Sequence, residues 1–114
     1  MLIEMSPDWY IGIPTWLEGI VTKDLGRDQY RIDDELKLHV IQWRDTKEVV
    51  ALWISCARNI TNHYCEAKQM SSDRWVFEGM SPSAYSTDSL RQYGRAQVLM
   101  ADIVERYEEF KKGR

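Results

Sequence analysis

The chain has 114 residues, of which 44% are hydrophobic and 29% are charged. This length predicts a single domain over residues 1–114, and the composition is that of a folded protein rather than a disordered one. The net charge of −3 disfavours nucleic acid as a partner, because a protein that binds phosphates needs a basic surface.

We expect a cytoplasmic protein. Its two cysteines, Cys56 and Cys65, are too few for the disulfide framework of a small secreted domain. Its first residues lack the cationic segment and apolar run of a secretion signal. No stretch approaches the roughly 20 apolar residues that a membrane span needs, so no membrane association is expected.

Residues 1–16 form an N-terminal arm that is rich in aromatic side chains and interrupted by prolines. Trp9, Tyr10 and Trp16 lie in this arm without a periodicity that would bury them in a helix or strand. Large aromatic residues with a polar atom are favoured at protein–protein contacts. The arm therefore either packs onto its own domain or contacts a partner.

Several stretches have the alternating pattern of half-buried strands. Residues 17–24 and 29–33 predict a hairpin, with Gly26 in the connection, where glycine tolerates a positive φ. Residues 36–43 alternate in the same way. Residues 74–78 predict a further short strand.

Residues 46–70 admit two interpretations. Apolar residues fall on one side of a helix drawn through this stretch, and Asp45 and Glu48 are spaced as a capping box, which predicts a second helix. The apolar, partly β-branched run Val-Val-Ala-Leu-Trp-Ile instead favours a buried strand. The alternative is a meander with strands at 48–56 and 63–70.

Residues 89–111 predict a long amphipathic helix with a broad apolar side. Ser89 and Gln92 are spaced as a capping box at its start, and Gly113 suits its end. Such a helix is not stable alone in water, so its apolar side must pack on the sheet or on a partner. Gly94 lies inside it at a cost of about 1 kcal/mol relative to alanine, and we expect it to contact another backbone closely.

Together these elements predict an α+β fold. An antiparallel sheet of at least four strands has the long C-terminal helix packed on one face, and the first interpretation of residues 46–70 adds a second helix. Within residues 16–43, Trp-Leu-Glu-Gly-Ile-Val is followed by a polar turn, Gln-Tyr-Arg-Ile and a third alternating run. This order resembles an SH3-like small barrel; the resemblance covers about a quarter of the chain and implies no function.

The sequence carries no recognisable catalytic or cofactor-binding motif, so we expect no cofactor and do not expect an enzyme. His39, Cys56, His63 and Cys65 do not match the spacing of a zinc site. No nucleophile elbow, P-loop or dinucleotide fingerprint is present.

The leading hypothesis is a non-enzymatic protein-binding module whose partner is another protein. Small acidic inhibitors, immunity proteins and counter-defence proteins cover a basic surface on a target in this way, and this comparison is an analogy. A run of three carboxylates could face such a surface, and one valine lies in the middle of the polar side of the C-terminal helix. The candidate partner-binding residues are Trp9, Tyr10, Trp16, Asp33, Asp34, Glu35 and Val98.

Two alternatives stay open. The first is a small-ligand-binding or enzyme domain with a pocket between sheet and helix, lined by His39, Asp33 and the two thiols. The second is a structural homodimer built on the C-terminal helix, in which the sheet covers one part of the broad apolar side and a second subunit covers the rest.

Overall fold

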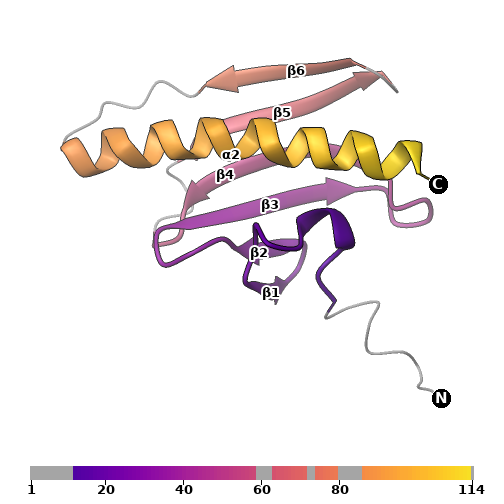
Figure 1. Cartoon of the computed structure of the whole chain (residues 1–114), viewed down its shortest axis with the longest axis horizontal. Coiled ribbons are helices and arrows are strands. Elements are labelled where there is room, and N and C mark those ends of the chain that lie inside the picture. The colour runs from indigo at the N-terminus through magenta and orange to yellow at the C-terminus, as the bar shows by residue number, and fades with distance from the viewer. Residues whose placement is uncertain (1–11, 59–62, 72–73, 80–85, 114) are drawn as a thin grey trace.

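The computed structural model describes residues 12–58, 63–71, 74–79 and 86–113. This part of the chain contains one short 3-10 helix, six strands and one long α-helix (Figure 1). In chain order they are η1 (Thr15–Leu17), β1 (Lys23–Gly26), β2 (Gln29–Arg31), β3 (Leu36–Gln42), β4 (Val49–Cys56), β5 (His63–Ser71), β6 (Arg74–Gly79) and α2 (Thr87–Lys112).

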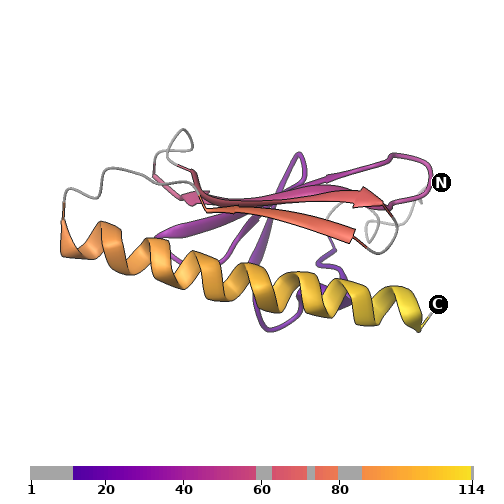
Figure 2. The same cartoon turned by 90° about the horizontal axis from the view of Figure 1, so that it is seen from above.

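The six strands form one antiparallel sheet in chain order, from β1 at one edge to β6 at the other. Helix α2 lies across one face of the sheet, which we call the helix face (Figure 2). The opposite face, which we call the open face, carries no helix within the described ranges. The predicted α+β fold is therefore confirmed. The sheet is open, so residues 16–43 are not part of a closed barrel, contrary to the SH3-like resemblance.

The predicted hairpin is shorter than expected, because the residues before Lys23 include the 3-10 helix η1 rather than a strand. The connection between β1 and β2 has positive φ at Gly26 (83°), Arg27 (54°) and Asp28 (64°). The carboxylate of Asp24 accepts a hydrogen bond from the N–H of Gly26 at 2.8 Å, which stabilises this turn. Glycine thus occupies a left-handed position, as predicted.

Residues 46–70 form two strands, so the prediction of a second helix was wrong and the meander was right. Leu52 of β4 lies opposite Ala67 of β5, and Ile54 lies opposite Cys65. β4 is a central strand that is buried on both faces, so its apolar residues form a nearly continuous run. Such a run has no period of its own, which is why it also fitted one side of a helix.

The suspected capping box before this segment is a turn between β3 and β4. The N–H of Thr46 donates to the Asp45 carboxylate at 2.9 Å, and the N–H of Glu48 donates to the Thr46 hydroxyl at 3.3 Å. Lys47 has a positive φ of 64°, which no helix start would contain. Asp45 therefore stabilises a turn and does not begin a helix.

Helix α2 begins earlier than predicted. Its N-cap is Ser86, whose hydroxyl accepts a hydrogen bond from the N–H of Ser89 at 3.1 Å. Ser89 is therefore already inside the first turn and does not cap the helix. The 26 residues of α2 span about 39 Å. Lys111 and Lys112 lie in the last turn, where positive charge stabilises the helix dipole. No described helix has the length and apolar composition of a membrane span.

The core lies between the helix face of the sheet and the apolar side of α2. Tyr107 of α2 is at its centre and is 1% exposed. Its ring lies 4.9 Å from the ring of Trp16 and 6.1 Å from that of Trp75, and its hydroxyl accepts a hydrogen bond from the N–H of Val49 at 2.9 Å. One helix side chain thus contacts η1, β4 and β6. The other buried helix residues are Ala96, Met100, Ile103 and Val104.

We predict that Tyr107→Phe destabilises the protein by about 1–3 kcal/mol, because it leaves the buried N–H of Val49 without an acceptor. Urea denaturation measures the change. Tyr93→Phe is the matched control, because the hydroxyl of that half-buried helix residue bonds to no other described residue; its change should stay below about 0.5 kcal/mol. Equal losses in both variants would contradict this account of the core.

The expected close contact at Gly94 is absent, because a Cβ built there meets no described atom within 4 Å beyond its own helix backbone. We therefore predict that Gly94→Ala stabilises the protein by about 1 kcal/mol. Gly19→Ala is the control, because Gly19 has a φ of 83° and alanine there should destabilise. A loss of stability in Gly94→Ala, measured by urea denaturation, would mean that the position is not open.

Candidate functional site

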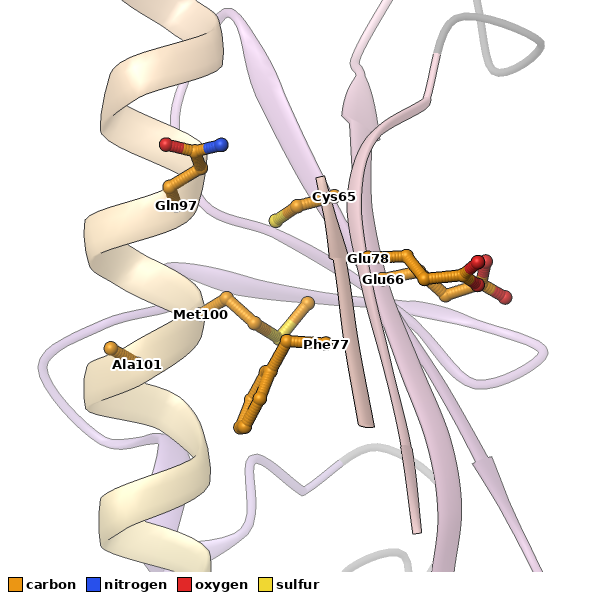
Figure 3. A pocket seen from close by; sticks show the side chains of 7 residues that line it. All are labelled: Cys65, Glu66, Phe77, Glu78, Gln97, Met100 and Ala101. Carbon is orange, nitrogen blue, oxygen red and sulfur yellow. The ribbon is translucent and has the colours of Figure 1, made fainter. Parts of the chain in front are cut away.

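An open groove lies on the helix face, between α2 and the two strands β5 and β6 (Figure 3). Its volume is about 270 Å³. Three helix residues and four strand residues line it: Gln97, Met100 and Ala101 from α2, and Cys65, Glu66, Phe77 and Glu78 from the strands.

The surface of the groove is apolar. The Met100 side chain reaches from α2 toward the sheet and lies beside the Phe77 ring, while the carboxylates of Glu66 and Glu78 leave on the other side of the sheet (Figure 3). Met100 is buried, but Phe77 is 56% exposed. The groove therefore suits apolar side chains and presents no carboxylate to them.

The alternation along β6 explains why Phe77 is exposed. Trp75 and Phe77 both point to the helix face, since they are two residues apart on a strand. Trp75 is anchored there, because its Nε1–H donates to the Glu108 carboxylate at 3.1 Å and its ring meets Tyr107 edge-on. Phe77 lines the groove together with Met100 and Ala101, and 56% of its surface stays exposed.

The outer edge of β6 forms the rim of this groove. β5 pairs with one edge of β6, and no described residue pairs with the other. The opposite edge of the sheet is protected, because β1 has four residues and an irregularity between Asp24 and Gly26. The register of β6 against β5 runs without a break from Trp75 to Gly79. An unpaired, regular edge beside an apolar groove is the geometry used for binding an added strand.

The thiol in the groove is not a nucleophile. Cys65 is buried, and its Sγ–H donates to the carbonyl oxygen of Ala96 at 3.3 Å. Burial raises the pKa of this thiol to about 12, so it stays protonated at neutral pH. The groove can bind a group but has no activated side chain here to react with it.

A second cluster of polar side chains lies on the open face. The ring of Trp53 stacks on His39 with a centroid distance of 4.9 Å and on His63 with one of 5.6 Å. The Nε2 atom of His39 lies 3.0 Å from the Oγ atom of Ser55, which is fully buried. A hydroxyl without exposed surface cannot attack a substrate, so this pair does not form a catalytic dyad.

His39 is uncharged at neutral pH. Burial is the main cause that lowers the pKa of its ring, from 6.5 to about 4, and the nearby charges of Lys37 and His63 lower it further. Because His39 belongs to the open face, it does not line the groove beneath α2. The groove therefore lacks the histidine that the hypothesis of a ligand-binding or enzymatic pocket had placed there.

The predicted acidic cluster is tied to its own domain. Asp34 pairs with Arg31, and Asp33 pairs with Arg95 of α2. Burial of Asp33 would raise the pKa of its carboxyl, but the hydrogen bonds from Arg95 and from two backbone N–H groups outweigh burial and lower it. Glu35 is exposed and lines a separate cavity of about 110 Å³ near the start of α2.

The other predicted partner-binding residues are scattered. Trp16 is 8% exposed and packs on Tyr107, so its ring offers a partner little surface. Trp9 and Tyr10 lie outside the described residues. Val98 is 65% exposed on α2, consistent with its place on the polar side of the helix, but it is not among the residues that line the groove.

Within the described ranges, no three side chains of His, Cys, Asp or Glu are close enough together to hold a metal ion. Scans against protein-family models, curated proteins and solved structures found no match to this chain. The geometry of the groove and of the two sheet edges therefore carries the functional argument.

Neither Phe77 nor Met100 was among the predicted site residues, because alternation and helical periodicity show which side of an element a residue occupies but not how far the covering element extends. The adjacent apolar residues Val76 and Phe77 in the last predicted strand indicate only that one of them faces away from the helix, and in the structure that residue is Val76.

We predict that acidification lowers the free energy of unfolding because of His39. In the unfolded chain this histidine takes up a proton near pH 6.5, whereas in the folded protein it does so only near pH 4. The stabilisation that is present above pH 6.5 is therefore lost as the pH falls to 4. The loss is at most about 3 kcal/mol. Urea denaturation at about pH 7.5 and about pH 4.5 should show a smaller loss in His39→Gln than in the wild type. Equal losses would mean that His39 is protonated in the folded protein.

Proposed function

We propose that this protein is a protein-binding module that accepts an extended segment of a partner protein along β6. The observation that carries this proposal is the outer edge of β6, which pairs with no described residue and lies beside an apolar groove, with Phe77 56% exposed at the boundary. We do not propose catalysis, because the groove offers a protonated thiol and no acid or base directed into it.

The backbone of β6 would provide affinity, and the groove would provide selectivity. An added strand makes main-chain hydrogen bonds with any sequence, whereas its alternate side chains enter pockets of defined size. The groove is open and has a volume of about 270 Å³, which is enough for one or two apolar side chains of such a strand.

The acidic residues support a basic partner surface less strongly in the structure than they did in the sequence. Asp33 and Asp34 already pair with arginines of this chain, so they are partly neutralised. The proposed contact is instead apolar and made through the backbone. A module of this kind acts by occupying its partner, as an inhibitor does, and this role remains part of the proposal.

Site-specific photo-crosslinking in the native host tests the proposal. A photoreactive phenylalanine analogue replaces Phe77 in one variant and Val98 in another. Both side chains are exposed and apolar, but only Phe77 lies in the groove. We expect a protein adduct from position 77 and at least about tenfold less from position 98, with the adduct mapped to β6 and an extended segment of the partner. Adducts at equal yield, or none at position 77, would refute the proposal.

A further inference from the structure

The sequence of β6 is chemically self-complementary. Its first five residues are Arg74, Trp75, Val76, Phe77 and Glu78, and Gly79 ends the strand. The order of these five is symmetrical about the valine, with an aromatic residue on each side of it. The first and the fifth residue carry opposite charges, which is the arrangement that two antiparallel copies of one strand need in order to match.

We propose that the partner strand at β6 is β6 of a second copy of this chain, paired antiparallel about a two-fold axis at Val76. This inference rests on the proposed function, because it uses the same edge and the same groove, and it names the partner. Two identical edges paired in this way form a closed, isologous contact, so the assembly ends at the dimer. The two sheets then continue into one another.

On the open face, this register brings opposite charges together twice. Arg74 lies opposite Glu78 of the partner subunit, and Glu78 lies opposite Arg74 of the partner subunit. Both side chains are exposed, and neither forms an ion pair with another described residue. Val76, which is 41% exposed, lies opposite its own copy between the two charge pairs. A shift of one residue in either direction would lose all three matches.

On the helix face, the same register places Trp75 opposite Phe77 of the partner subunit, and the reverse. Cross-strand aromatic pairs stabilise a sheet, and Phe77 has 56% of its surface available for the contact. The axis runs perpendicular to the sheet, so both α2 helices lie on one face of the joined sheet. The two grooves then meet above four aromatic rings, and the exposed part of the Phe77 ring is buried.

Two other surfaces of the described chain, β1 and α2, fit a second copy less well. β1 is short and irregular, so it is a poor template for strand addition. The buried side of α2 is already occupied by the sheet, and the exposed Leu90 and Val98 of α2 stand apart among polar neighbours. The dimer inferred here is therefore built on β6 rather than on the C-terminal helix.

Analytical ultracentrifugation of the full chain and its charge variants tests the inference. Five paired residues per copy, from Arg74 to Glu78, make a small interface, so we expect a wild-type dissociation constant on the order of 10 µM. Arg74→Glu and Glu78→Arg each bring like charges together twice and should raise that constant at least about tenfold. An equimolar mixture of the two variants restores both opposite pairs, so it should dimerise about as well as the wild type.

Lys23→Glu is the matched control, because it makes the same charge change as Arg74→Glu on an exposed residue at the other edge of the sheet. It should leave the dissociation constant unchanged within about twofold. Far-ultraviolet circular dichroism establishes that each variant is folded. Crosslinking from position 77 needs no charge variant and should give an adduct of twice the chain mass, joined through β6 of both copies.

Three outcomes would overturn the inference. The first is a wild-type chain that stays monomeric up to about 0.1 mM, about tenfold above the expected constant. The second is a dimer whose dissociation constant is unchanged in both charge variants, which would place the contact elsewhere. The third is a position-77 adduct with a different protein, which would refute the self-pairing but support the proposed function. Absence of any position-77 adduct would refute both.

Discussion

The packing of one side of α2 against the sheet is the contact on which the rest of the structure depends. An antiparallel sheet of this size must cover an apolar face, and a long amphipathic helix must cover an apolar side, so each element supplies what the other lacks. Tyr107 shows how closely the two are joined, because one side chain contacts η1, β4 and β6. A single helix, however, is narrower than six strands.

This difference in width between the helix and the sheet determines which part of the helix face stays exposed. The helix contacts β5 and β4 and leaves the β6 margin of the helix face partly uncovered, so Phe77 is exposed above a buried Met100. The two edges of the sheet also differ: β1 is short and irregular, whereas β6 keeps an unbroken register from Trp75 to Gly79. Of the two edges of the described sheet, β6 is therefore the one suited to strand pairing.

The C-terminal helix and the outer strands could be predicted because their patterns are local. A 3.6-residue period over more than six turns has no competing interpretation, and alternating strands such as β3 reveal which side is buried. The boundaries were harder: Ser86 and Ser89 both precede suitable residues, and only the hydrogen bond to the N–H of Ser89 distinguishes the cap. β4 was ambiguous because a central strand is apolar on both faces.

The amino-acid sequence by itself determined the α+β class, the long amphipathic helix and the self-complementary order of Arg74 to Glu78, because each depends on residues close together in the chain. The tertiary structure decided which residues those elements leave uncovered. It buried Trp16, paired Asp33 with Arg95 and exposed Phe77. Exposure depends on where a distant element ends in space, and local periodicity carries no information about that distance.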